Sequence, residues 1–312
     1  MRLRILLTAA VTLGQVALAV AQSPITAGAL VPGGKQVVVG SQAGIEVREF
    51  PSLKRIRQLK TELENVHDLR FSPDGKTLAA GGGAPGDAGQ IQLFRWPSGQ
   101  AAKPHELHSD LVSQIRWLAA GKFVTASQDR TAIVVDKGKA ESKLRAHSRG
   151  LTCLAAFSFG KSQWLLTGGL DRSLRCWKLG QSKPIRSLDQ HRGAIRDVAV
   201  RPNQTGLPIV ASASVDKTVR LWQPTIGRMM RFAKLKSSPL SLAWTPGGDR
   251  LAVGCSDGKV GIVDPDTAVV LHTLNGIDGW AYTLVMSRDG KKLLVAGGSG
   301  KMKVIAVPSG GN

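Results

Sequence analysis

The sequence predicts an all-β protein in which one four-stranded unit is repeated seven times. A Gly-rich turn, seen clearly at residues 73–76 (Pro-Asp-Gly-Lys), recurs roughly every 40 to 46 residues. Each copy lies between two short apolar runs, a pattern typical of a hairpin. A second turn, as at residues 214–218, follows in the clearer copies and leads into a strand of alternating polarity. These three observations favour short strands over helices along the whole chain.

The first turn of each unit marks the seven repeats. These turns lie at residues 32–35, 73–76, 119–122, 159–161, 202–204, 246–248 and 288–291. Seven small twisted sheets fit a radial arrangement around an axis better than they fit a two-sheet sandwich. We therefore expect residues 22–312 to form a single domain, a seven-bladed β-propeller of four-stranded antiparallel blades.

The first 21 residues have the pattern of a secretory signal peptide. Arg2 and Arg4 precede an apolar stretch over residues 5–20, and Ala-Val-Ala at residues 19–21 suits cleavage before Gln22. A retained membrane anchor is the alternative, although the stretch is short for a span. Cleavage predicts an exported protein, periplasmic or extracellular. It also leaves too little chain for an added strand, so we expect a three-stranded last blade with an open edge at residues 302–307, which a partner's strand can pair with.

Composition narrows the possible partners. The 42 Lys and Arg residues against 22 Asp and Glu give a net charge of +20. Such a field attracts nucleic acid, acidic polysaccharide, anionic lipid surfaces or acidic proteins, unless the charges are merely spread for solubility. The three cysteines, Cys153, Cys176 and Cys255, are an odd set and predict buried thiols in place of a disulfide framework.

The fifth unit carries the most informative motif. His191, Ser214, Asp216 and Trp222 stand at the positions of the structural tetrad of the WD-repeat family, which the chain resembles over residues 23–310. Partial tetrads follow in the fourth and third units, formed by His147, Asp171 and Trp177, and by His108, Ser127 and Asp129. The resemblance implies a buried polar chain in which each group satisfies its neighbour. It therefore argues against a catalytic Ser-His-Asp arrangement.

The same resemblance implies that two sets of loops share one face of the ring. This face would gather five basic residues of units three to five, namely Arg130, Arg149, Arg172, Arg192 and Lys217. They are candidate contacts for an anionic partner, and the alternative is that they are simply solvated. Trp280, which precedes the innermost strand of unit seven, is a candidate anchor on this face, unless it packs against the neighbouring blade.

No motif predicts a catalytic site, a metal or a cofactor. Residues 160–162 (Gly-Lys-Ser) lack the opening glycine and the helix of a phosphate-binding loop. On the innermost strands only Asp68 and Asp197 are acidic, on opposite sides of the ring, which is too few for an axial metal cage. We expect an exported, non-catalytic scaffold that binds a protein or an anionic polymer. The alternatives are an envelope enzyme, hydrolase-like or lactonase-like, and less favoured nucleic-acid binding.

Overall fold

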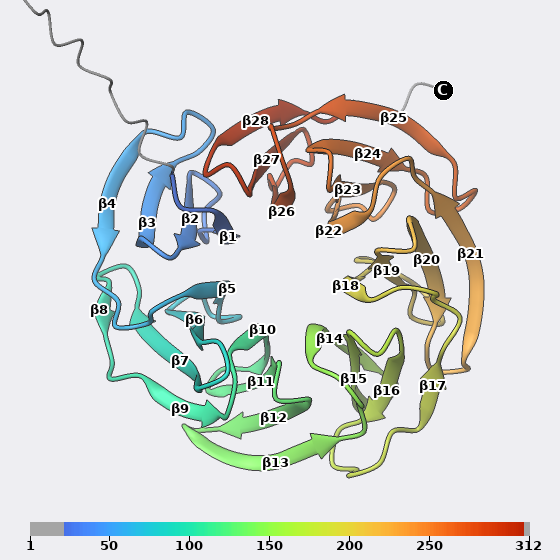
Figure 1. Cartoon of the computed structure of the whole chain (residues 1–312), viewed down its shortest axis with the longest axis horizontal. Coiled ribbons are helices and arrows are strands. Elements are labelled where there is room, and N and C mark those ends of the chain that lie inside the picture. Colours follow the sequence, from blue (N-terminus) through green and yellow to red (C-terminus); the bar gives the residue numbers. More distant parts are fainter. Residues whose placement is uncertain (1–21, 309–312) are drawn as a thin grey trace, which may run out of the picture.

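The computed structural model describes residues 22–308, which form seven antiparallel sheets arranged around a central axis (Figure 1). The predicted seven-bladed β-propeller is confirmed. The predicted signal peptide lies outside the described residues. Within residues 22–308 no helix is long and apolar enough to cross a membrane.

Each blade is a simple meander that runs from the axis to the perimeter. The innermost strands are β1 (Ile25–Leu30), β5 (Val66–Phe71), β10 (Val112–Ala119), β14 (Leu151–Phe159), β18 (Ile195–Val200), β22 (Pro239–Trp244) and β26 (Ala281–Met286). The second strands are β2 (Gln36–Ser41), β6 (Thr77–Ala84), β11 (Lys122–Ser127), β15 (Ser162–Gly169), β19 (Val210–Ser214), β23 (Leu251–Cys255) and β27 (Lys292–Gly297). The third strands are β3 (Gly44–Glu49), β7 (Ala88–Arg95), β12 (Thr131–Asp136), β16 (Leu174–Lys178), β20 (Thr218–Gln223), β24 (Lys259–Val263) and β28 (Met302–Ala306). The outer strands are β4 (Arg55–Leu59), β8 (Gln100–Ala101) with β9 (His105–His108), β13 (Lys139–Arg145), β17 (Arg186–Leu188), β21 (Arg228–Lys234) and β25 (Val270–Asn275).

The apolar core lies between neighbouring blades. Every residue of β19 and of β23 is buried, because both faces of a second strand are covered by adjacent blades. The outer strands face water on one side, and β4 accordingly keeps only Leu59 buried. All three cysteines are free and buried, as predicted.

Two blades depart from the four-stranded pattern. In the second blade the outer strand is broken into β8 and β9, which both pair with β7. Pro104 lies in the gap, and it has no N–H to donate to the ladder. The last blade has three strands, as predicted, and ends at β28.

At least one hydrogen bond that involves a side chain joins each innermost strand to the next around the axis. The donors and acceptors are Thr26 Oγ1 to Val66 O, Ile115 N to Asp68 Oδ2, Ser113 Oγ to Leu151 O, Thr152 Oγ1 to Ile195 O, Leu242 N to Asp197 Oδ2, Ser241 Oγ to Ala281 O and Thr283 Oγ1 to Ile25 O. These bonds close the ring at the level where the innermost strands begin. The last of them, 3.4 Å long, bridges the seventh blade and the first, where Ile25 also packs with Val285 and Leu294.

Candidate functional site

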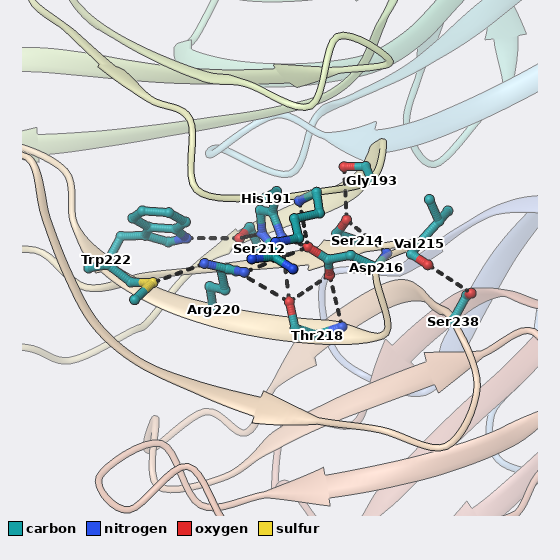
Figure 2. Close-up of polar contacts among 12 residues, drawn as sticks. His191, Gly193, Ser212, Ser214, Val215, Asp216, Thr218, Arg220, Trp222 and Ser238 are labelled. Atoms are coloured by element: carbon teal, nitrogen blue, oxygen red, sulfur yellow. Dashed lines mark hydrogen bonds and ion pairs between the residues drawn. The ribbon is translucent and has the colours of Figure 1, made fainter.

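The fifth blade contains a buried polar chain that runs from its third strand to the loop before its first (Figure 2). The indole Nε1 of Trp222 donates to Ser212 Oγ at 2.8 Å, and Ser212 lies 2.7 Å from His191 Nε2. His191 Nδ1 lies 2.8 Å from Asp216 Oδ2. The chain is consistent when the Ser212 hydroxyl donates to Nε2 and Nδ1–H donates to Asp216, which leaves a neutral imidazole.

The hydroxyl of this chain belongs to Ser212, so the assignment of Ser214 to the tetrad was wrong. Ser214 Oγ instead donates to Gly193 O at 2.9 Å and accepts from Asp216 N at 3.2 Å, on the far side of the aspartate in Figure 2. Both serines lie on β19 two positions apart, and alternate residues of a strand share a face. The sequence pattern therefore allowed either serine.

The same correction applies to the fourth and third blades. Thr167 supplies the hydroxyl in the fourth, accepting from Trp177 Nε1 at 2.9 Å and lying 2.8 Å from His147 Nε2. That tetrad is complete, because His147 also lies 3.0 Å from Asp171.

In the third blade Thr125 takes the equivalent place, 2.7 Å from His108 Nε2, and His108 Nδ1 lies 2.9 Å from Asp129. Ser127 donates to Asp110 O and is not part of the chain. Val135 stands at the position that Trp222 has in the fifth blade.

Burial and hydrogen bonding set the charges of these networks. Burial alone raises the pKa of Asp216, but bonds from Thr218 and His191 outweigh it and lower the pKa to about 2. Burial lowers the pKa of His191, against the attraction of Asp216. The fifth-blade chain is therefore a neutral histidine beside a carboxylate. Ser212 is fully buried, so a substrate has no access to its hydroxyl.

Each aspartate also holds two loops of the same face in place. Asp216 Oδ2 accepts from Arg192 N at 3.0 Å and Asp216 Oδ1 from Thr218 N at 3.0 Å, which joins the loop before β18 to the turn before β20. Asp171 does the same in the fourth blade through Ser148 N. The networks therefore order the loops that carry the predicted basic residues.

Those five residues are exposed, and all lie in loops at the end of the ring where the innermost strands begin. They are Arg130, Arg149, Arg172, Arg192 and Lys217, and we call them the basic rim. Three of them have left-handed backbone, with φ of 71° at Arg130, 69° at Arg172 and 65° at Lys217.

The equivalent positions of the first, sixth and seventh blades hold glycine. These are Gly44, Gly258 and Gly300, each with positive φ. A left-handed residue with a Cβ costs about 1 kcal/mol or more relative to glycine. Blades three to five therefore hold long cations where glycine is the less strained choice.

A pocket of about 740 Å³ opens at the axis on the same face. Every innermost strand has a β-bulge near its start, and the extra residue of each bulge lines this pocket. These residues are Thr26, His67, Ser113, Thr152, Arg196, Leu240 and Tyr282. Bulges re-aim side chains and are common beside binding sites. We call this space the mouth pocket. Sequence reasoning missed it, since an inserted residue leaves little trace in the apolar pattern.

One side of the mouth pocket is aromatic. Trp280 is 54% exposed, so it does not pack into the neighbouring blade, and its ring meets that of Tyr282 edge to face at 5.6 Å between centroids. Burial raises the pKa of Tyr282, and the charge of Arg196 opposes this rise. Burial lowers the pKa of His67, which favours a neutral ring there.

A belt of polar side chains lies across the channel. Gln114 Nε2 donates to Asp197 Oδ1 at 3.0 Å, while Gln114 Oε1 accepts from Arg116, which also pairs with Asp68 at 3.1 Å. The two carboxylates, expected on opposite sides of the ring, are therefore linked through Gln114 and Arg116. Burial lowers the pKa of Arg116 to about 10, as does its neighbour Arg70, while burial raises the pKa of Asp197.

Within the belt, Asp68 forms ion pairs with Arg70 and Arg116, while Asp197 is held by neutral donors. Asp197 also accepts from Val198 N and Leu242 N, so its carboxylate is fully engaged. Within residues 22–308 no group of three or more His, Cys, Asp or Glu side chains is placed to hold a metal ion.

Sequence comparisons agree with this architecture. The model described as "WD domain, G-beta repeat" matches residues 53–94, 138–178 and 182–223. The "Anaphase-promoting complex subunit 4 WD40 domain" model matches residues 209–281. Each of the three repeat matches spans the outer strand of one blade and the first three strands of the next.

Three curated relatives illustrate the range of similar proteins. The p21-activated protein kinase-interacting protein 1-like of Danio rerio is 27% identical over 54% of this chain and 45% of its own. The B-type cell cycle switch protein ccs52B of Medicago truncatula is 23% identical over 75% and 48%. Protein transport protein sec13 of Aspergillus oryzae is 32% identical over 33% and 38%. The chain spans about half or less of the length of these relatives.

Proposed function

Because the chain belongs to the WD-repeat family, whose propellers generally bind protein partners, we propose that it is a non-catalytic scaffold that binds an acidic protein through the face bearing the basic rim. One observation carries this proposal. In three consecutive blades the turn before the third strand holds a long cation in left-handed backbone, where other blades use glycine. Glycine is the less strained residue at such positions, so this arrangement supports a role for the three cations in binding rather than in stability.

The basic rim suits recognition by charge. Its side chains are exposed, and exposed charges act mainly on the rate and specificity of association. The loops that carry them are ordered by Asp171 and Asp216, which limits the entropy lost on binding. The rim is therefore a preorganised surface for an anionic partner.

Charge reversal tests this proposal. The triple variant Arg130→Glu, Arg172→Glu and Lys217→Glu is compared with a control of equal charge change on the opposite face, Lys35→Glu, Lys137→Glu and Lys161→Glu. Immobilised proteins are incubated with extract of the source cells, and captured proteins are identified by mass spectrometry.

We expect partners captured by the wild type and the control to be lost from the rim variant. Equal capture by all three proteins would overturn the proposed face. Capture of nucleic acid or acidic polysaccharide alone, with a steep loss at raised salt, would assign the rim to an anionic polymer instead.

We also propose that the protein is exported. The support is the basic start, the apolar stretch and the small residues before Gln22. Intact-mass analysis of the protein recovered from its native compartment tests this. A chain beginning at Gln22 outside the cytoplasm is expected, and a chain retaining residues 1–21 inside the cell would contradict export.

A further inference from the structure

The mouth pocket combines a free positive charge with an exposed aromatic surface. Arg196 is the one Arg or Lys among its lining residues, and it is exposed. Within residues 22–308 its guanidinium has no ion pair or side-chain hydrogen bond, in contrast to Arg116 and Arg70 of the belt. A cation placed in a concave site without an internal counter-charge is available to a ligand.

The only carboxylate in the lining, that of Asp197, forms no ion pair with Arg196. Asp197 is adjacent to Arg196 in sequence, but its two oxygens accept from Gln114 Nε2, Val198 N and Leu242 N. These bonds direct the carboxylate into the belt and the next blade. Among residues 22–308 the guanidinium of Arg196 is therefore left free to meet a ligand carboxylate.

The apolar part of the lining is also left uncovered by the rest of the protein. Trp280 is exposed although aromatic side chains of this size usually find cover, and it is held in place edge to face on Tyr282. Leu111, Val215 and Leu240 add aliphatic surface from the third, fifth and sixth blades. A pocket of this kind fits one apolar side chain with a charged group close by.

We propose that the mouth pocket binds a short acidic peptide segment that places one aromatic or aliphatic side chain against Trp280 and a carboxylate on Arg196. This inference rests on the proposed scaffold function and names the part of the partner that enters the axis. The basic rim extends the positive field over blades three to five, so acidic residues flanking the anchor lie toward those blades.

The pocket is the right size for a side chain and its flanking backbone. About 740 Å³ is within the ordinary range for small ligand sites, and too small for a folded domain. The hydroxyls of Ser113 and Thr152 already donate to the neighbouring blades, Gln128 donates to Leu151 O, and Ser238 donates to Val215 O. Hydrogen bonding to a ligand therefore falls mainly to His67 and the hydroxyl of Ser256.

Selection from a random peptide library displayed on phage tests the proposal with the full-length protein. Two pocket variants, Arg196→Gln and Trp280→Ala, are compared with two variants on the perimeter strand β21, Arg228→Gln and Phe232→Ala. Phe232 is 53% exposed, so it matches Trp280 in exposure but lies far from the axis. Selected peptides are then synthesised, and their affinities are measured by calorimetry.

We expect enriched peptides to carry an acidic residue within about three positions of an aromatic or aliphatic one. Each pocket variant should weaken them at least about tenfold, and neither perimeter variant should. Arg196→Glu should redirect selection toward basic peptides.

Enrichment of peptides without acidic residues, absence of any enrichment, or equal binding to Trp280→Ala would overturn the inference. The proposed function is tested separately. If the rim variant loses its cellular partner while the pocket variants keep it, the scaffold stands and the pocket ligand is wrong.

Discussion

Replacement of Ser212 by alanine tests the corrected tetrad most directly. The side chain accepts from Trp222 Nε1 and bonds to His191 Nε2, and the three residues are 0%, 0% and 4% exposed for Ser212, Trp222 and His191. The substitution removes one oxygen, so little cavity is created. Two buried polar groups lose their partner, at about 1 to 3 kcal/mol each. We expect Ser212→Ala to lower the free energy of unfolding by about 2 to 6 kcal/mol.

Two further variants make the comparison specific. Ser214→Ala removes the hydrogen-bond partner of Gly193 O and Asp216 N. Both groups lie in partly solvated loops, so the free energy of unfolding should fall by only about 1 kcal/mol. Ser212→Thr should stay within about 1 kcal/mol of the wild type, because Thr125 and Thr167 occupy the equivalent position in other blades. Urea unfolding followed by circular dichroism gives all three values. A larger loss for Ser214→Ala than for Ser212→Ala would refute the reassignment.

Three other predictions follow from the buried ionisable groups and the buried thiols. The free energy of unfolding should fall below about pH 6.5, because the folded state lowers the pKa of His191 and so disfavours its protonation. It should fall again from about pH 4 to 2, because folding lowers the pKa of Asp216 to about 2. Urea midpoints that stay constant from pH 7 to 3 would contradict this prediction. Asp68→Ala should lower the free energy of unfolding by about 3 to 5 kcal/mol, because it leaves the buried Arg116 without its ion-pair partner. Adding Arg116→Met should recover part of this loss in the same unfolding assay. A thiol reagent at pH 8 should leave the folded protein unmodified and label three cysteines after denaturation, because burial shields each thiol and raises its pKa. Rapid labelling of the folded protein would show that the thiols are accessible. The thiols are those of Cys153, Cys176 and Cys255.

The sequence was sufficient for the blades because their signal is repeated. A turn between two apolar runs occurs in every unit, so seven weak patterns supported one another. The three-stranded last blade was also anticipated. The break between β8 and β9 was not anticipated, although Pro104 was visible. A single proline in a short polar strand has too small an effect on the pattern to place a break.

The site was predictable only in part, for reasons of geometry. Ser212 and Ser214 face the same way on β19, and only the distance to Trp222 and His191 distinguishes them. Threonines four residues before the turn aspartate, Thr125 and Thr167, were the available clue. The mouth pocket depends on one bulge residue from each of seven strands, and those residues share no chemical type.

The junction between the seventh blade and the first differs from the other six in one respect. Elsewhere the chain itself passes from blade to blade, so neighbours stay tethered when their contacts break. Across β26 and β1 the contacts among residues 22–308 are non-covalent and include the Thr283 bond and apolar packing. Parting there converts the ring into an open arc without unfolding any blade. Thr26 and Tyr282 lie on the two sides of this junction and also line the mouth pocket. A ligand that contacts both residues would therefore stabilise the closed ring.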